Sequence, residues 1–557
     1  MTPRGAGSFP TPQERVAATA TGSSLSLWAK AIPDLVAISS PSGERTFAEL
    51  DANICRVARA LRRRGLLAGD PVAVVLSNRP EFAEVIHACL RIGLRYTPVN
   101  RHLTAGEIAY IVSDCGAKAL IGDAALGELM VEAAAGSTGP AVRWAVGGEV
   151  AGFERYEEVI GAENGDDLDD PVLGNRMLYT SGTTGRPKGV LRPPLYSTGL
   201  NALTDAPRYE AASGQLNLCT GPLYHGGPLV YSLLMPLSCG VGVVLMERWD
   251  AATALELIHH HRITHTHMVP TMFYRLLRLP EEARRAADVS SMQYIVHGAA
   301  PCTVEAKRAM IDWFGPILWE YFAATEGAGS SISPEEWLER PGSVGRPPTD
   351  DHVVIRGADG AECPAGVAGR IHIKRVAGAD FEYFNDPAKT EAARRGDSFS
   401  VGDIGYLDSD GYLFVTDRDA DVIVSGGVNI YPAEVETVLL THPAVYDVAV
   451  IGVPNEDFGE EVKAVFEVAS GVEVGPQLVD DLVAHCRDRL AKFKCPRTID
   501  VIDRLPRHDN GKLYRNELRD RYRHPPTHRR VDAVTDHLQF PANAARVDPI
   551  GPADAAP

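Results

Sequence analysis

The stretch from Tyr179 to Val190 reads Tyr-Thr-Ser-Gly-Thr-Thr-Gly-Arg-Pro-Lys-Gly-Val, and it decides the fold. From Thr180 to Gly189 it holds four hydroxyls, three glycines and two cations. Glycines let the backbone curl so that successive N–H groups point into one concavity, which suits the oxygens of a polyphosphate. Arg186 and Lys188 add positive charge. The pattern predicts a phosphate-binding loop.

This loop is not the most common type of phosphate loop, because the spacing G-x-x-x-x-G-K-[ST] is absent. A flexible surface loop is the alternative interpretation of any cluster of glycine, serine and threonine. The Lys188-Gly189 pair at its end and the apolar residues Met177 and Leu178 before it favour the phosphate-binding interpretation.

Size and charge limit the classes of function. The chain has 557 residues, which is too long for one core and predicts two or more domains. Apolar residues make up 45% and charged residues 23%, as in ordinary globular proteins. The formal charge of −18 argues against nucleic acid as a partner, because phosphate backbones need a basic face. The composition favours an enzyme whose anion sites are local.

Cysteine usage and apolar runs indicate a cytoplasmic protein. The nine cysteines are scattered without a C-x-x-C pair, which is typical of reduced thiols. Residues 1–13 lack the apolar run of a signal peptide. Residues 228–246 carry no charge over a length that could span a bilayer, but Pro236, Gly240 and Gly242 interrupt them. We expect a buried helix followed by a buried strand there, and no integral membrane segment.

The sequence before Phe381 alternates β-rich runs with helical patterns, which predicts parallel strands joined by helices. Strands are expected at 72–76, 96–99, 119–121, 264–269 and 294–296, and helices at 80–91, 104–113 and 252–260. Short strands separated by Gly/Asp turns follow, and then a compact α+β unit. We expect an α/β fold, with a large N-terminal domain of parallel or mixed sheets layered with helices and a small mobile C-terminal α+β domain. The boundaries are a flexible N-terminus at 1–24, domains at 25–418 and 419–523, and a disordered tail at 524–557.

A group of histidines raises the question of a metal site. His259, His260 and His261 lie together at the end of an expected helix, and His265 and His267 follow. No carboxylate or cysteine joins them at ligand spacing. Alternating histidines on a strand point to one face whatever their function. We expect structural roles for all five.

Further segments recur in a fixed order along the chain. They are Pro222-Leu-Tyr-His-Gly-Gly, His297-Gly-Ala-Ala-Pro, Glu320-Tyr-Phe-Ala-Ala-Thr-Glu-Gly, Gly402-Asp-Ile-Gly-Tyr-Leu, Thr416-Asp-Arg, Ser425-Gly-Gly-Val-Asn-Ile and Asn510-Gly-Lys. With the phosphate-binding loop, this ordered set resembles the adenylate-forming superfamily of acyl-CoA synthetases, adenylation domains and luciferases. The resemblance covers about residues 25 to 520.

The resemblance implies two half-reactions on small-molecule partners. A carboxylate attacks the α-phosphate of ATP to give acyl-AMP and pyrophosphate, and a thiol then displaces AMP. It implies ATP, Mg²⁺ and coenzyme A as cosubstrates or cofactors, and a carboxylic acid as substrate. Related ligases are often dimers, so a homodimer is one expected state, which the sequence does not decide.

The resemblance assigns residues to the phosphates and the metal. The residues around the β- and γ-phosphates would be Thr180, Ser181, Gly182, Thr183, Thr184, Gly185 and Lys188. Glu326 would hold Mg²⁺, and the Thr325 hydroxyl would contact the α-phosphate. Lys512 would bridge the substrate carboxylate and the α-phosphate; a solvated surface lysine is the alternative.

For the nucleotide, the resemblance implies that Asp403 accepts hydrogen bonds from the ribose hydroxyls and that Arg418 assists there. Phe322 stands where the family usually has a tyrosine that stacks on adenine, and its ring retains that ability. A plain core aromatic is the alternative for Phe322. Gly298, Ala299 and Ala300 would form the thin wall beside the base and the acyl group.

The expected acyl pocket contains His225, Gly298 and Ala323. Most relatives have glycine at the position of Ala323, and acetate-specific ones have a tryptophan that blocks the pocket. One methyl group narrows such a pocket without closing it, which favours a larger apolar acid. His225 would sit at the junction of the acyl and pantetheine channels; a core histidine is the alternative. Medium- or long-chain fatty acids, a steroid side-chain acid and an aryl acid all remain compatible.

In the second half-reaction the small domain would turn and present Ser425, Gly426 and Gly427 to coenzyme A. The hinge is expected at residues 419–421. The usual hinge lysine or aspartate is replaced by Ala420, which puts the energetics of the hinge in doubt.

We interpret the chain as an ATP-dependent acid–CoA ligase. An acyl-AMP ligase that loads a carrier protein is the nearest alternative, although we expect no carrier domain in the short tail after His524. A luciferase-like oxygenase and a nucleotide-binding protein without catalysis are further alternatives. Retention of Thr325, Glu326 and Lys512 argues against the last of these.

Overall fold

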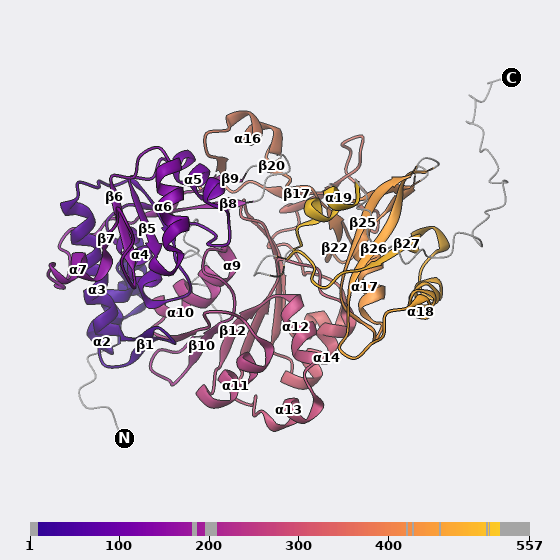
Figure 1. The fold of residues 1–557 in the computed structure, drawn as a ribbon, viewed down its shortest axis with the longest axis horizontal. Coiled ribbons are helices and arrows are strands. Elements are labelled where there is room, and N and C mark those ends of the chain that lie inside the picture. Colours follow the sequence, from indigo (N-terminus) through magenta and orange to yellow (C-terminus); the bar gives the residue numbers. More distant parts are fainter. Residues whose placement is uncertain are drawn as a thin grey trace. The chain divides into compact units, whose positions relative to one another are not determined.

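The computed structural model describes residues 9–180, 187–194, 209–418, 421–425, 428–455, 458–507, 511 and 513–523, with only the backbone at 418, 429 and 523 (Figure 1). The chain divides into two compact units. The larger consists of Met1–Ala420 and Arg507–Leu513, and the smaller of Asp421–Pro506 and Tyr514–Pro557.

Parallel strands buried on both faces build the first sheet of the larger unit. The strand β3 is the unbroken apolar run Pro71–Val75, which is typical of such a position. The order is β18-β9-β8-β4-β3-β5-β6-β7, in which the six strands from β8 to β7 are parallel and β9 and β18 antiparallel. The bounds are β3 Pro71–Val75, β4 Arg95–Pro98, β5 Ala119–Asp123, β6 Val142–Val146, β7 Glu154–Arg155, β8 Asn175–Thr180, β9 Lys188–Leu191 and β18 Glu382–Tyr383.

A second eight-stranded sheet has the same plan. Its order is β15-β14-β13-β12-β10-β11-β1-β2, with six parallel strands between the antiparallel edge strands β15 and β2. The bounds are β1 Val36–Ser40, β2 Gly43–Thr46, β10 Leu216–Cys219, β11 Gly242–Leu245, β12 His265–Met268, β13 Tyr294–His297, β14 Leu318–Ala323 and β15 Ala328–Ile332. Strands β10, β13 and β14 lead into the motif segments that begin at Pro222, His297 and Glu320.

The third sheet of the larger unit is antiparallel, and sequence analysis saw it only as Gly/Asp turns between short strands. Its order is β19-β20-β17-β21-β22, with β16 paired to β17. The bounds are β16 Val353–Arg356, β17 Gly369–Lys374, β19 Arg394–Arg395, β20 Ser398–Phe399, β21 Asp403–Leu407 and β22 Leu413–Arg418.

Helices of the larger unit cover the two parallel sheets. In α3, Thr46 and Glu49 form a capping box, and Leu50, Ile54, Val57 and Leu61 form a buried stripe at helical spacing. The helices with eight or more residues are α1 Pro12–Ala20, α2 Ser24–Ala31, α3 Phe47–Arg63, α4 Pro80–Arg91, α5 Ala105–Asp114, α6 Gly127–Gly136, α11 Ala251–His261, α12 Pro270–Leu277 and α14 Val304–Phe314. Shorter ones are η1 Ala124–Leu126, α7 Tyr156–Gly161, α13 Glu281–Ala286, α15 Pro334–Glu339 and α16 Pro387–Ala393.

The uncharged segment 228–246 folds as a buried helical stretch followed by a buried strand, as expected. The helical part consists of α9 Gly226–Leu229, the π-helical η3 Val230–Leu234 and α10 Met235–Ser238, before β11. Pro236 lies in the first turn of α10, where the π-helical η3 changes to α-helix, and β11 begins at Gly242. Among the described residues, no helix has the length and apolarity needed to cross a bilayer.

The smaller unit is a five-stranded sheet with helices. Its order is β24-β23-β26-β25, and β27 adds a parallel strand to β26. Helices α17 and α19 pack against β25, and α18 packs against α17. The bounds are β23 Ile423–Ser425, β24 Val428–Ile430, α17 Pro432–Leu440, β25 Val445–Asn455, β26 Gly459–Val468, α18 Pro476–Arg487, η4 Lys492–Lys494, β27 Thr498–Val501 and α19 Arg515–Arg523.

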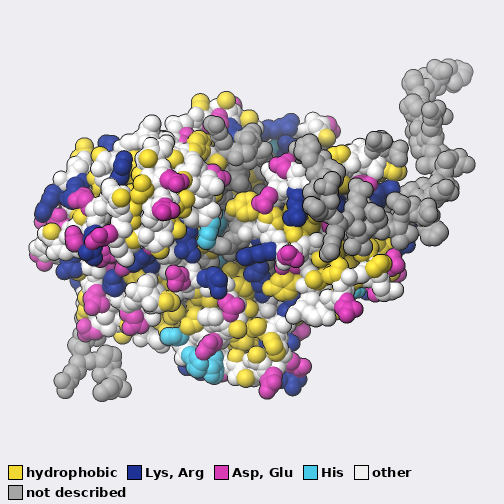
Figure 2. Space-filling view, viewed as in Figure 1, with side chains coloured by type: hydrophobic (Ala, Val, Ile, Leu, Met, Phe, Trp, Pro, Cys, Tyr) yellow, Lys and Arg dark blue, Asp and Glu magenta, His cyan; other side chains and the backbone are white. Residues whose placement is uncertain are grey.

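The surface is mixed in charge. Figure 2 shows acidic and basic side chains interspersed on the visible face, and a group of histidines in the region where Figure 1 places α11. His260 and His261 are exposed at the end of that helix, and the ring of His259 accepts a hydrogen bond from the backbone N–H of Asp288. Exposed side chains and a hydrogen bond of this kind are ordinary at the end of a helix.

Candidate active site

The predicted phosphate-binding loop connects the antiparallel strands β8 and β9. Thr180 ends β8 and is the register partner of Lys188, the first residue of β9. The Thr180 hydroxyl oxygen is buried and has no hydrogen-bond partner among the described residues. A buried hydroxyl in this state is costly unless a ligand or water engages it. The strand pairing therefore fixes one hydroxyl and one ammonium group at the base of the loop.

Lys188, Glu326 and Tyr383 come together beside this loop. Lys188 Nζ lies 3.6 Å from Glu326 Oε1 and 3.8 Å from the centre of the Tyr383 ring. The Tyr383 hydroxyl donates a hydrogen bond of 2.7 Å to Glu326 Oε1. Burial and the neighbouring carboxylate raise the pKa of Tyr383, so its hydroxyl remains a donor. An ammonium group and a carboxylate are thus held on adjoining elements.

Sequence analysis missed Tyr383. It lies in the two-residue strand β18, which pairs with β9 so that Tyr383 faces Val190 in register. No local pattern marks it, because its position depends on a pairing between segments far apart in the sequence. The only signal in the sequence was the aromatic run of Phe381, Tyr383 and Phe384, and such a run is typical of a hydrophobic core.

The turn after β14 presents Thr325 and Glu326. It is closed by two backbone hydrogen bonds between Ala324 and Gly327, one in each direction. Glu326 is buried and Thr325 half-buried. A Cβ atom on Gly327 would lie 2.8 Å from the Phe399 ring, so the third sheet holds this turn tightly. The turn is therefore packed in place.

Phe322 precedes this turn on β14. It is half-buried, and a Cβ atom on Gly329 of β15 would lie 2.5 Å from Phe322 Cδ1. The ring also packs at the margin of the apolar cluster of the third sheet. The protein therefore packs against one side of the Phe322 ring. This packing is compatible with both interpretations, a ring that stacks on adenine and a plain core aromatic.

The loop after β13 carries Gly298, Ala299 and Ala300. A Cβ atom on Gly298 would lie 2.6 Å from the backbone oxygen of Tyr321 and 2.8 Å from its ring, so only glycine fits. Ala299 is exposed and has a φ of 67°, a left-handed conformation that is costly for alanine. Such strain is common where a backbone is shaped for a ligand.

The two residues predicted at the ribose lie on neighbouring strands. Asp403 begins β21 and is the register partner of Arg418 at the end of β22. The Asp403 side chain is buried. The antiparallel pairing therefore places an acidic and a basic residue, from two separate motifs, opposite each other on neighbouring strands.

His225 lies at the N-cap of α9, with its ring 4.6 Å from that of Tyr224. The two glycines that follow it allow a close approach of the backbone to the sheets. A Cβ atom on Gly226 would lie 3.1 Å from Leu178, and one on Gly227 would lie 2.9 Å from both His267 Nε2 and the Tyr321 hydroxyl. Gly227, two residues after His225, and the predicted acyl residue Gly298 thus both lie against Tyr321. Ala323 lies two residues further along β14.

Part of the predicted site falls outside the described residues. This part is Ser181, Gly182, Thr183, Thr184, Gly185, Gly426, Gly427, Lys512, the Arg418 side chain and the hinge residues 419–420. Ser425 ends β23 in the smaller unit, paired with Val428 and Gly459. Gly511 belongs to the larger unit, has a φ of +80°, and leaves no room for a Cβ atom beside Thr271.

Comparison with known proteins decides the family. The model of the AMP-binding enzyme family matches residues 25–379, and that of the AMP-binding enzyme C-terminal domain matches residues 434–512. The chain belongs to the AMP-binding enzyme family. It lies in the acyl-CoA synthetase branch of the adenylate-forming superfamily, as its motifs indicated, and it is an AMP-forming acid–thiol ligase.

The relatives of this ligase act on different acids. A feruloyl-CoA synthase from Amycolatopsis sp is 33% identical over 501 residues, covering 89% of this chain and 97% of that protein. The long-chain-fatty-acid–CoA ligase FadD13 of Mycobacterium tuberculosis is 32% identical over 504 residues, covering 88% and 96%. The crystal structure of the anthranilate CoA ligase AuaEII with anthranoyl-AMP has a TM-score of 0.82 and 23% identity, covering 90% and 97%. That similarity confirms the α/β fold with a large N-terminal and a smaller C-terminal domain.

A buried ion pair joins helix α14 to strand β14 of this ligase. Sequence analysis did not predict this pair. Lys307 on α14 lies 2.7 Å from Glu320 Oε2 on β14, and neither side chain is appreciably exposed. Desolvation lowers the pKa of Lys307 and raises that of Glu320, while the pairing opposes both shifts. A buried pair of this kind fixes the position of α14 on β14.

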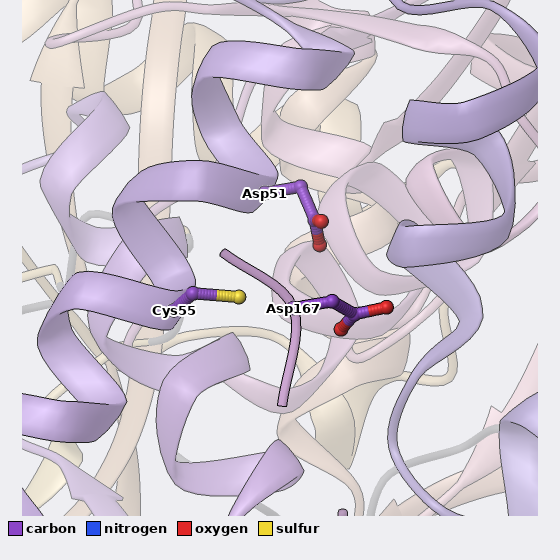
Figure 3. Close-up of side chains that lie close together, drawn as sticks. All are labelled: Asp51, Cys55 and Asp167. Carbon is purple, nitrogen blue, oxygen red and sulfur yellow. The ribbon is translucent and has the colours of Figure 1, made fainter. Parts of the chain in front are cut away.

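A second cluster in this ligase has the composition of a metal site but not its chemistry. Figure 3 shows Asp51, Cys55 and Asp167, whose ligand atoms lie within 4.8 Å of one another. The guanidinium of buried Arg91 satisfies them, at 2.6 Å from Asp51 Oδ1, 3.1 Å from Cys55 Sγ and 4.0 Å from Asp167 Oδ1. Lys30 Nζ also lies 2.8 Å from Oδ2 of the exposed Asp167, so two cations balance the two carboxylates of the cluster.

Proposed function

We propose that this ligase activates a carboxylic acid with an apolar body by reaction with ATP, and then transfers the acyl group to coenzyme A. The products are acyl-CoA, AMP and pyrophosphate. The observation that carries the proposal is the convergence of Lys188, Glu326 and the buried Thr180 hydroxyl, which has no hydrogen-bond partner in the described part of the chain, at one loop. These groups come from two motifs, and polyphosphate chemistry needs all three types.

The first half-reaction joins two anions, so the site must neutralise their repulsion. Lys188 lies on a rigid strand, where its ammonium group can contact the outgoing phosphates. Thr180 and the loop residues up to Gly185 would donate further hydrogen bonds. Thr325 is held by the packed turn and would contact the α-phosphate. Lys512 would bridge the carboxylate and the α-phosphate in this step.

Glu326 fits the role of a magnesium ligand. It offers a hard carboxylate oxygen, and the hydrogen bond from Tyr383 orients the group. When bound, Mg²⁺ would offset the charge of the phosphates. Lys188 lies beside the same carboxylate. Its ammonium group would also offset the charge of the phosphates, and it would keep the Glu326 carboxylate oriented when the metal is absent.

The remaining predicted residues would hold the nucleotide and the acyl group. Asp403 and Arg418 would bind the ribose, and Phe322 would stack on adenine with Gly329 at its back. Gly298 allows the nucleotide and acyl group to pass close to β14. Ala323 and His225 would border the acyl group. Replacement of Ala323 by tryptophan should shift preference toward very short acids.

For the second half-reaction, we propose that the smaller unit turns about residues 419–421 and that Ser425, Gly426 and Gly427 contact coenzyme A. The Lys512→Ala variant tests this division of labour. It should abolish acyl-AMP formation and leave thioester formation from supplied acyl-AMP largely intact. Equal damage to both halves would refute the assignment.

The proposal is tested by incubating the enzyme with ATP, acid and coenzyme A and determining the product by mass. Acyl-CoA together with AMP and pyrophosphate is the expected result. Accumulation of acyl-AMP despite coenzyme A would favour the alternative, a ligase that loads a carrier protein. Absence of pyrophosphate release with every acid tested would refute both.

A further inference from the structure

One face of the second sheet carries rings and polar groups in place of aliphatic side chains. Register partners in parallel strands point to the same face, and Asn217, His265 and Tyr294 are such partners across β10, β12 and β13. The side chains that these strands and β14 place on this face are Asn217, Cys219, His265, His267, Tyr294, Val296, Trp319 and Tyr321. We call these eight residues the ring face.

The ring face forms a connected network. The Tyr321 hydroxyl and His267 Nε2 are hydrogen-bonded at 3.0 Å. Tyr231, from the π-helical segment η3, stacks parallel to the His267 ring at 5.7 Å and lies 5.1 Å from the Tyr321 ring. Short π-helical segments recur at functional sites because they turn a side chain inward.

At the other end of the ring face, Tyr209 lies 4.4 Å from the ring of His265. The Asn217 amide donates a hydrogen bond of 2.7 Å to the Tyr209 hydroxyl. The Asn217 carbonyl oxygen is buried and has no hydrogen-bond partner among the described residues. This acceptor lies on the same face as the rings and, within the described ranges, no donor reaches it.

The ring face adjoins the residues proposed to border the acyl group. Gly298 lies against the backbone and ring of Tyr321, and Gly227 lies against His267 and the Tyr321 hydroxyl. Gly227 follows His225 by two residues, and Ala323 follows Tyr321 by two. An acyl group bordered by His225, Gly298 and Ala323 therefore extends along Tyr321 and His267.

The rings are accessible yet withdrawn from bulk water. Tyr231, Tyr294, Trp319 and Tyr321 are each half-buried. Desolvation raises the pKa of Tyr231 to about 12 and raises those of Tyr294 and Tyr321 as well. A planar ring of a ligand can stack on these side chains, because part of each ring is accessible while bulk water is largely excluded.

The ring face is electrically neutral. Desolvation lowers the pKa of His265 to about 4 and that of His267 to about 3, so both imidazoles are uncharged at neutral pH. None of the eight residues is then ionised. Such a face offers no counter-charge to a second carboxylate on the substrate.

We propose that the acid substrate is an aryl acid whose ring carries an uncharged hydrogen-bond donor, such as a phenolic hydroxyl. The inference rests on the proposed ligase function and narrows its substrate. The aromatic ring stacks among Tyr231, Tyr294 and Tyr321, and the hydroxyl donates to the carbonyl oxygen of Asn217. A saturated chain would bury that acceptor unpaired and gain no stacking.

The experiment measures acid-dependent exchange of labelled pyrophosphate into ATP with a matched panel. The probes are 4-hydroxycinnamate, cinnamate, the straight-chain acid of equal carbon number, 4-carboxycinnamate and the alicyclic acid cholate. We expect kcat/KM for 4-hydroxycinnamate to exceed that for cinnamate by at least about tenfold, because a site built to bond a hydroxyl discriminates against its absence. The other three acids should be poorer than cinnamate.

The Asn217→Leu variant removes the acceptor at similar volume. It should reduce the ratio of kcat/KM for 4-hydroxycinnamate over cinnamate to near one. If that variant does not fold, Tyr321→Phe, which removes only a hydroxyl of the network, should also lower the ratio. The matched control Tyr412→Phe removes a tyrosine hydroxyl that donates to Glu336 Oε1, outside the ring face, and should leave the ratio unchanged.

The outcomes separate the inference from the function on which it rests. Exchange that is equal or faster with the straight-chain acid, 4-carboxycinnamate or cholate overturns the ring-face inference and leaves the ligase intact. A ratio that Asn217→Leu does not change overturns the role of its carbonyl oxygen. No exchange with any acid overturns the ligase proposal itself.

Discussion

The two faces of strands β10, β12, β13 and β14 differ sharply in chemistry. One is the ring face, with imidazole, phenol and amide groups. The other presents mainly aliphatic side chains, among them Leu218, Met268, Ile295 and Leu318, to a core that α11, α12 and α14 complete. A single set of strands thus serves as scaffold on one side, and on the other it carries the surface that we propose recognises the substrate. Substitutions on the two faces should therefore fail in different ways.

The largest expected effect is at Glu326, in the turn after β14, which is the proposed magnesium ligand beside the phosphates. Glu326→Gln retains the shape of the side chain and removes its charge. Acid-dependent pyrophosphate release should fall by about 10²–10³-fold, as for other preorganised electrostatic groups. The melting temperature should change little. The exposed Glu339→Gln serves as control, and equal activity of the two variants would contradict the assignment of Glu326.

The aliphatic face should show the opposite behaviour. Leu318 is fully buried on β14, and Leu318→Ala should lower the free energy of unfolding by about 2–5 kcal/mol. Activity per folded molecule should be retained, because the side chain points away from the ring face. Urea unfolding followed by circular dichroism measures the loss. Leu338→Ala, at a leucine that is 40% exposed, should lie within about 0.5 kcal/mol of wild type.

How far the sequence predicted these features depends on how local each one is. Helix α4 begins and ends at the predicted residues, because Pro80 marks its first turn and apolar residues recur at helical spacing. The motif residues were found because each lies in a short contiguous run. Tyr383, the pair of Lys307 and Glu320, and the ring face were not found, because they arise from register between distant segments.

Acid should weaken the protein through its buried neutral histidines. The pKa values of His265 and His267 are about 4 and about 3 in the folded state, against about 6.5 when exposed. The unfolded chain binds protons below about pH 6.5 that the folded ring face does not. The stability is therefore present above about pH 6.5 and is lost as the pH falls toward about 4.

Each of these histidines should lower the free energy of unfolding by about 1.4 kcal/mol per pH unit within that window. Urea unfolding at several pH values measures the slope. Other buried histidines, namely His87, His297 and His372, also have lowered pKa values, so variants are needed to separate their contributions from that of the ring face. His267→Gln should reduce the slope and the exposed His261→Gln should not. A slope unchanged by His267→Gln would contradict a neutral buried imidazole.

The smallest expected effect concerns Tyr383. The Tyr383→Phe variant removes the hydrogen bond to Glu326 and leaves the ring beneath Lys188. One hydrogen bond to a charged group is worth about 1.5–3 kcal/mol, and the adjacent lysine offsets part of the loss. We expect a rise in KM for ATP of several-fold with kcat nearly retained. A loss as large as that of Glu326→Gln would show that the hydroxyl has a direct role in catalysis.

The measurement that tests the central claim most directly is acid-dependent exchange of labelled pyrophosphate into ATP in the absence of coenzyme A. The structure predicts exchange that requires an organic acid, is fastest with a hydroxylated aryl acid, and disappears in Glu326→Gln. A folded wild-type protein that shows no exchange with any organic acid would contradict it.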